Sequence, residues 1–493
     1  MANTIPPTGT TAVPPGAEAV VDVFADRDDV STDGRMGGEP TLALGGRLAF
    51  ASPEICLALF FVSFNSWLLY FLVNVAGLPA LLAGAAFLLG RGFDAVMDPV
   101  VGRWSDRTRP EHGRLRLIRW GVAPACILFV GVWAAPVLFE ATWAKFLAAA
   151  GAFMLFSFFY TLVAIPRVAL LPDLVPDYDA RTRQISLNMV FIFVSVLVAI
   201  ALVPPLVTGV SGVAELARTP PSAWITVAAL FGGVGFLAVL PFLFVVPDRR
   251  GGANVALPPL GAELRSLFQT PGYGLVVLIF LLSVLGTLMV QAMVPFYLES
   301  YLGIPGPQQG SILGGIFLLS ILSFPFWGWV GTRIGKRGGL VAGIAVYAGF
   351  LLMVPFMPRE GVTPIFVVAC ILSGIGISAI NLFPWAMLPD SVDMDTATHG
   401  RAREGLVYAV FVFAQKTAGS IAVFWSSIML WLFDHQAGQA VQGETTLTAF
   451  VWMTGPIPLA ILVLAALVTL RYPITREAQA QARRTVRMRE AHP

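Results

Sequence analysis

Long apolar runs separated by short polar segments fill most of this chain. A helix needs about 20 residues to cross a hydrocarbon core of ~30 Å, and each run is about that long. The sequence predicts twelve membrane spans, near residues 52–74, 79–104, 117–138, 143–166, 185–209, 222–246, 274–298, 309–331, 339–357, 363–388, 405–432 and 447–470. The pattern is typical of an all-α integral membrane protein.

Three segments lack this apolar pattern. Residues 1–46 are rich in Pro, Thr and Gly and have no basic stretch followed by an apolar run, so they predict a disordered tail and no cleaved signal. Residues 472–493 are polar and basic, and they predict a second tail. Residues 247–273 form a polar linker near the middle of the chain.

The basic residues indicate how the chain is oriented. Arginines crowd the segment between the second and third spans and recur after every later even-numbered span, whereas the odd-numbered connections carry only Lys145, Arg218 and Arg359. Cytoplasmic loops are the ones enriched in Lys and Arg. We therefore expect both tails and the linker on the cytoplasmic side of the plasma or inner membrane.

Two short motifs recur in the same order, about half a chain apart. Span two ends in PVVG (99–102) and span eight in PFWG (325–328), while span four ends in ALLPD (169–173) and span ten in AMLPD (386–390). The repeat predicts two six-helix bundles, residues 47–246 and 274–471, of the kind that rock around a central site to give alternating access.

Composition excludes several classes of protein. Only 12% of residues are charged, about half the share in a soluble protein. The 31 basic and 29 acidic residues leave no excess of base for nucleic acid. The histidines fall in predicted loops or the tail, away from any candidate catalytic group, so a membrane enzyme is disfavoured. No P-loop spacing is present, which argues against ATP-driven transport.

Among the charged residues within predicted spans, four are the candidates for function. Arg91, Asp94 and Asp98 follow one another at spacings of three and four, so they share one helix face. Lys416, one of three lysines, lies in span eleven. Intramembrane charge is costly and usually functional. We expect the carboxylates to form a site for Na⁺ or H⁺ that the two cations neutralise when it is empty. The alternative is an ion-pair cluster that only joins the two helices.

The motif R-x-x-D-x-x-x-D-P-x-x-G, from Arg91 to Gly102, resembles the glycoside–pentoside–hexuronide:cation symporters of the major facilitator superfamily. The resemblance extends from about residue 48 to residue 470. It implies the major facilitator fold, with Asp94 and Asp98 as cation ligands, Thr161 assisting them, Arg91 beside the substrate and Lys416 between the two sites.

The residues at the positions that bind sugar in this family differ in this chain. Two sugar-binding aspartates of the melibiose-permease branch correspond to Ala58 and Ala164, and an asparagine beside the cation site corresponds to Met97. The eukaryotic lysophospholipid symporters share the aspartate motif. The substrate therefore stays open between a sugar or glycoside and a lysolipid or other amphiphile, as do Na⁺ or H⁺ coupling and symport or antiport.

The remaining candidate residues fall into two groups. Asn65, Tyr160 and Asn381 are polar residues that could line the cavity. Residues that resemble the superfamily's motif between helices two and three, or that form candidate cytoplasmic gates, are Gly102, Asp106, Arg107, Gly113, Arg114, Asp173 and Asp390. We expect a monomeric, cation-coupled symporter of a small solute, in contact with membrane lipid and without a resident cofactor; a proton-coupled exporter is the alternative.

Overall fold

The protein is described here by a computed structural model covering residues 43–174, 178–248, 260–399 and 404–473, apart from 438, 440 and 441. Within these ranges the regular structure is entirely helical. The longer helices are α1 (Leu44–Ala51), α2 (Pro53–Ser63), α3 (Ala80–His112), α4 (Leu115–Ala134), α5 (Thr142–Leu174), α6 (Tyr178–Ala201), α7 (Val203–Ser211), α8 (Pro221–Val245), α9 (Leu260–Phe268), α10 (Tyr273–Phe296), α11 (Gly306–Met353), α12 (Pro364–His399), α13 (Glu404–Leu432), α14 (Glu444–Thr454) and α15 (Pro456–Leu470). Short π or 3₁₀ turns are η1 (Phe64–Leu68), η2 (Phe71–Val75), η3 (Ala135–Leu138), η4 (Leu216–Arg218), η5 (Tyr297–Tyr301) and η6 (Val354–Phe356).

Each predicted span overlaps a helical segment. By length and apolar character, the described residues contain ten membrane-spanning helices, or eleven if Leu187–Ala201 and Val203–Ser211, which meet at 41°, form one span. The bend between these two falls where Pro204 and Pro205 follow, and proline cannot continue the backbone hydrogen bonding of a helix. The number of membrane crossings stays a prediction.

Helix α11 covers two of the predicted spans and turns back on itself at Gly335, whose φ is 78° and ψ 166°. The indole nitrogen of Trp327 donates to the carbonyl of Ile375 at 2.8 Å, and Tyr347 packs directly against Gly376. In a straight helix Trp327 and Tyr347 would lie ~30 Å apart. Because both reach neighbouring residues of α12, the two segments of α11 lie side by side.

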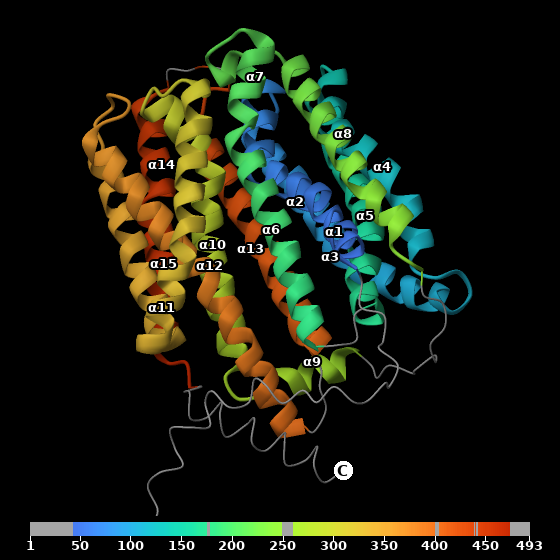
Figure 1. Cartoon of the computed structure of the whole chain (residues 1–493). Helices are drawn as coiled ribbons and strands as arrows, with labels where there is room; N and C mark the ends of the chain where they lie inside the picture. Colours follow the sequence, from blue (N-terminus) through green and yellow to red (C-terminus); the bar gives the residue numbers. More distant parts are fainter. Residues whose placement is uncertain are drawn as a thin grey trace, which may run out of the picture. The chain divides into compact units, whose positions relative to one another are not determined.

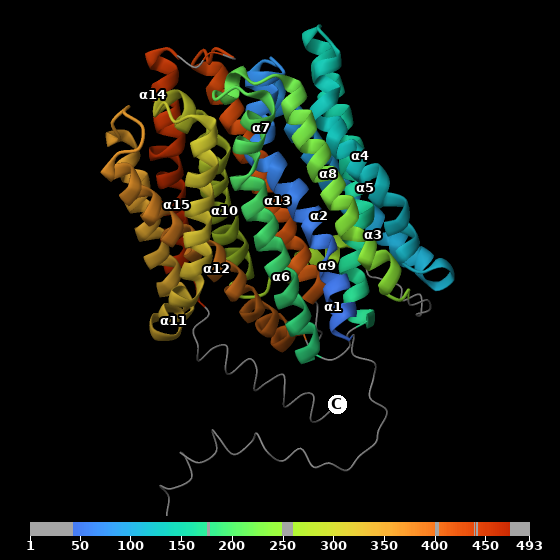
Figure 2. The ribbon, with the colours of Figure 1, turned by 45° about the horizontal axis from the view of Figure 1, so that its top comes forward.

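The helices gather in two groups along the sequence (Figure 1). We call α1–α8 the N-terminal half and α10–α15 the C-terminal half. Contacts between the halves run along α3 with α13 and along α6 with α11. Small residues allow the close approach: Gly84 of α3 faces Ser427 of α13, and Gly314 of α11 faces Ala201 of α6. Figure 2 shows α6 and α13 between the two groups.

The two halves end their first spans in the same way. After η2, Gly77 has φ +68°, and the amides of Ala76 and Leu78 donate to Phe71 and Leu72. After η5, Gly303 has φ +66°, and the amides of Leu302 and Ile304 donate to Tyr297 and Leu298. Each glycine is followed by one aliphatic residue and a proline. These tips are as far apart in sequence as Pro99 and Pro325, so the internal repeat extends to backbone geometry.

Hydrogen bonds join the two halves at these tips, and we call this side of the molecule the Gly77 end. The carboxylate of Glu299, in η5, accepts from the Tyr70 hydroxyl and from the Ala217 amide in η4, the latter at 3.0 Å. In the other direction, Asn74 of η2 bonds to the ring of His435, beyond α13, at 2.8 Å. Each tip is thus held by a loop of the opposite half, which fastens the Gly77 end shut.

The opposite side, which carries α9 and the start of α1, is here called the α9 end. Among the described residues, two hydrogen bonds at this end each connect elements of the same half. Thr270 donates to Asp395 at 2.7 Å within the C-terminal half, and Gln184 donates to the carbonyl of Arg47 at 3.0 Å within the N-terminal half.

Candidate functional site

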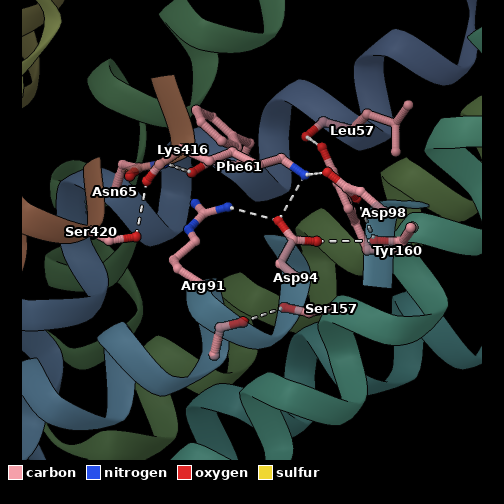
Figure 3. Close-up of polar contacts among 12 residues, drawn as sticks. Leu57, Phe61, Asn65, Arg91, Asp94, Asp98, Ser157, Tyr160, Lys416 and Ser420 are labelled. Atoms are coloured by element: carbon pink, nitrogen blue, oxygen red, sulfur yellow. Dashed lines mark hydrogen bonds and ion pairs between the residues drawn. The ribbon is translucent and has the colours of Figure 1, made fainter. Parts of the chain in front are cut away.

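Helix α3 places Arg91, Asp94 and Asp98 on one face, as their spacing predicts (Figure 3). The Asp94 side chain is 1% exposed and that of Asp98 22% exposed. The two carboxylates lie one helical turn apart, so a group on a neighbouring helix can contact both.

Lys416 of α13 is that group. Its ammonium nitrogen lies 2.9 Å from Asp94 Oδ2 and 2.5 Å from Asp98 Oδ2, and its side chain is 12% exposed. The hydroxyl of Ser420, one turn further along α13, donates to the Lys416 carbonyl at 2.9 Å. One cation from the C-terminal half is therefore shared by two carboxylates of the N-terminal half.

Thr161 of α5 completes the oxygen cluster on the other side of the carboxylates. Its hydroxyl lies 2.9 Å from Asp94 Oδ1 and 3.3 Å from Asp98 Oδ1. Five oxygens, four of them from carboxylates, thus converge on one region. Oxygen ligands of this kind suit small, hard cations.

Arg91 lies next to both a carboxylate and aromatic rings. Its NH1 is 3.9 Å from Asp94 Oδ2, while its guanidinium carbon lies 4.5 Å from the centre of the Phe61 ring and 5.4 Å from that of Phe87. Such stacking stabilises a desolvated cation. Arg91 NH2 is buried and has no hydrogen-bond partner.

The other candidate cavity residues lie in different places. The Tyr160 hydroxyl donates to the Leu57 carbonyl at 3.3 Å, and Asn65 donates to the Phe61 carbonyl at 2.7 Å; both border the charge cluster (Figure 3). Asn381 of α12 is exposed and donates to the Ile377 carbonyl one turn back.

The loop between α3 and α4 is built around Asp248, from the end of the N-terminal half. Its carboxylate accepts from the amides of Arg114 and Leu115 at 3.0 and 3.3 Å, which caps the start of α4. Gly113, at φ +72°, must be glycine because a Cβ would lie 2.2 Å from that carboxylate. The Arg114 guanidinium reaches back to Ser105 at 3.1 Å. This predicted motif therefore shapes a turn within one half.

Gly102, the last motif position on the membrane side, packs near Ile165 of α5. The predicted side chains of Asp106, Arg107 and Asp173 lie outside the described part of the structure. In the C-terminal half, Asp390 accepts from Lys336 at 2.6 and 2.7 Å, which ties α12 to the segment of α11 after Gly335.

Sequence reasoning missed a second buried ion pair. Arg167 NH2 of α5 lies 2.5 Å from Glu54 Oε1 of α2, and the two residues are 4% and 8% exposed. Glu54 lies within a predicted span and Arg167 directly after another, so an isolated charge in an apolar run was the available signal. Glu299, directly after another predicted span, was missed too; it accepts a hydrogen bond from the Tyr70 hydroxyl.

Comparison with known proteins places this geometry in a family. A family model described as "MFS/sugar transport protein" matches residues 49–476. An uncharacterized symporter of Synechocystis sp. is 26% identical, with 86% of this chain and 93% of that one covered. The sodium-dependent lysophosphatidylcholine symporter 1-A of Danio rerio is 24% identical, over 83% of this chain and 81% of that one.

A solved structure supports the fold. A bacterial homologue of the human lysosomal transporter Spinster, inward-facing and unoccupied, superposes with a TM-score of 0.62 at 14% identity, covering 89% of this chain and 100% of that one. The all-helical architecture, the apolar spans and the family match agree: the chain is a multi-pass membrane transporter that belongs to the MFS/sugar transport protein family.

Proposed function

We propose that this transporter is a Na⁺-coupled symporter that moves a small solute inward by alternating access. The observation that carries the proposal is the position of Lys416, whose ammonium group lies between the facing oxygens of Asp94 and Asp98. A cation of similar charge could replace it and be ligated by the same oxygens together with that of Thr161.

Exchange of one cation for another would couple ion binding to conformation. The carboxylates belong to α3 and the ammonium to α13, so a Na⁺ ion that displaces Lys416 also breaks the ion pairs between the two halves at this depth. A ligand shifts a conformational equilibrium only if it interacts differently with the two states. The lost ion pairs supply such a difference.

The hydrogen bonds of Glu299 and of Asn74 close the Gly77 end in this state. The arginine distribution predicts that the α9 end faces the cytoplasm, and with that orientation the state described is one closed toward the outside. Opening of the Gly77 end would admit Na⁺ and solute, which are then released at the α9 end.

A sugar or glycoside is our first candidate for the solute, supported by the description of the family model. A lysolipid is the second candidate, supported by the resemblance to the lysophosphatidylcholine symporter and by the absence of carboxylates at Ala58 and Ala164.

Thermal denaturation of the purified protein tests the proposal. The unfolding temperature should rise with NaCl at constant ionic strength, and it should rise further when sugars or lysolipids are added with Na⁺ than when they are added with K⁺. Equal unfolding temperatures in NaCl and KCl under every condition would contradict Na⁺ coupling. Stabilisation that instead follows pH at the same cluster would assign the role to H⁺.

A further inference from the structure

The pair formed by Glu54 and Arg167 lies within the apolar interior of the N-terminal half. Arg167 is 4% exposed, its guanidinium carbon lies 5.7 Å from the centre of the Phe50 ring, and its NH2 is 2.5 Å from Glu54. Both residues belong to segments long and apolar enough to span a membrane. Ionisable groups at such depth are costly and mark binding or transport sites by default.

The pair does not use all the donors of the arginine. Nε and NH1 of Arg167 are buried and have no hydrogen-bond partner. A buried donor without a partner costs about 1–3 kcal/mol, more when it is charged. If Arg167 served only to join α2 to α5, these N–H groups would be expected to donate to neighbouring backbone carbonyls. Two nitrogens without a partner, next to a third that contacts Glu54, indicate a place for an acceptor from outside the chain.

The pair joins α2 and α5, the two helices that also contribute Phe61 and Thr161 beside the cation cluster. On α5, Thr161 contacts the aspartates and Arg167 follows six residues later, ~9 Å along the axis. On α2, Phe61 covers Arg91 and Glu54 precedes it by seven residues, ~10 Å. The Arg167 pair is therefore about two turns from the cation cluster, toward the α9 end.

The residues one turn away along each helix offer no acceptor from their side chains. Ala58 lies one turn from Glu54 on α2, and Ala164 lies one turn from Arg167 on α5. The Tyr160 hydroxyl donates to the carbonyl of Leu57, which lies between Glu54 and Phe61 on α2.

We propose that Arg167 binds an anionic oxygen group of the transported solute, a carboxylate or a phosphate, and that Glu54 fixes the arginine in position. The inference rests on the proposed function and adds the substrate class to it. Arginine is suited to this task because charge-assisted hydrogen bonds to carboxylate or phosphate are short and strong. An anionic solute and one Na⁺ together also add no net charge to the interior of the protein.

Two sources can supply such a group, and matched probes separate them. Glucuronate and glucose differ in the carboxylate, while lysophosphatidate and monoacylglycerol of equal chain length differ in the phosphate. Binding of each probe is measured in Na⁺ to the native protein in lipid nanodiscs, to Arg167→Gln and to Arg167→Lys. Arg359→Gln is the matched control, because Arg359 forms an exposed pair with Glu444 at 2.7 Å.

The native protein should bind one anionic probe more tightly than its neutral partner. Arg167→Gln should weaken that anionic probe about tenfold or more and leave the neutral one unchanged, since a hydrogen bond to a charged group is lost. Arg167→Lys should recover part of the affinity, and Arg359→Gln should resemble the native protein. Preference for glucuronate identifies a sugar acid as the source, and preference for lysophosphatidate a lipid.

Equal affinity of the native protein for both members of each probe pair would overturn the inference. So would an equal loss of anionic and neutral probes in Arg167→Gln, which is what a purely structural pair predicts. In either case, stabilisation of the native protein by Na⁺ would leave the symporter proposal standing. Loss of that stabilisation would instead contradict the symporter proposal.

Discussion

Replacement of Asp94 by asparagine tests the cation site most sharply. The amide has the shape of the carboxylate and can still accept from Thr161, but it carries no charge. The Asp94 side chain is 1% exposed and lies 2.9 Å from Lys416 and 3.9 Å from Arg91. The substitution leaves both cations facing Asp98 alone. Loss of one partner from a buried ion pair costs about 3–5 kcal/mol.

The same free energy sets the scale for Na⁺. A site that loses one of two charged ligands and gains net positive charge should bind Na⁺ more than about 100-fold more weakly, the equivalent of about 3 kcal/mol. Asp94→Asn should therefore unfold at a lower temperature than the native protein and show no rise with NaCl. The measurement is an NaCl titration of the unfolding temperature, balanced with KCl.

A control substitution separates this effect from general destabilisation. Asp390→Asn removes another buried aspartate paired with a lysine, 2.6 Å from Lys336, in the other half of the protein. It should lower stability and keep the native response to Na⁺. If folded Asp94→Asn responds to NaCl with the native midpoint, the carboxylate is not a Na⁺ ligand and the reasoning is refuted.

Three further predictions concern ligand geometry and closure. Thr161→Val keeps the side-chain shape but removes a hydroxyl near Asp94, so the Na⁺ midpoint should rise about tenfold in the same titration; an unchanged midpoint would exclude the hydroxyl as a ligand. Glu299→Ala removes two hydrogen bonds between the halves. In proteins that carry Asn74→Cys as a reporter, adding Glu299→Ala should therefore speed the reaction of that cysteine with an impermeant maleimide; equal rates would show that closure does not depend on Glu299. Burial lowers the pKa of His435 to about 4. The closed Gly77 end therefore binds fewer protons than an open one, and acidification from pH ~6.5 toward ~4 should weaken closure by up to about 3 kcal/mol. The protection of backbone amides at the Gly77 end from hydrogen exchange, corrected for the intrinsic pH dependence of exchange, should fall with acid in the native protein and lose this dependence in His435→Gln; the same dependence in both would assign it to another group.

The sequence predicts much of this fold because lipid imposes a simple rule. Each apolar run of sufficient length is helical in the structure. The two spans predicted at 309–331 and 339–357 both fall on α11, and its direction reverses between them at Gly335, as separate spans require. Which of the several glycines in the segment 328–339 adopts the positive φ could not be predicted from the sequence.

The candidate site was also predictable only in part from the sequence. Arg91, Asp94 and Asp98 lie on one helix, so their spacing alone predicts that they share a face. The ion pair of Glu54 with Arg167 joins residues 113 apart, and the bond of Tyr70 with Glu299 joins residues 229 apart. No local period connects such residues, because their proximity arises only from the packing of whole helices.

Solute flux in proteoliposomes tests the central proposal of Na⁺-coupled symport most directly. Purified protein is reconstituted, an inward Na⁺ gradient is imposed, and the uptake of labelled hexoses, hexuronates and lysolipids is followed. The proposal predicts that one of these classes accumulates inside above its external concentration and that accumulation disappears when K⁺ replaces Na⁺ or when Asp94 is replaced by asparagine. Accumulation that persists without any cation gradient, or solute expelled as Na⁺ enters, would contradict it.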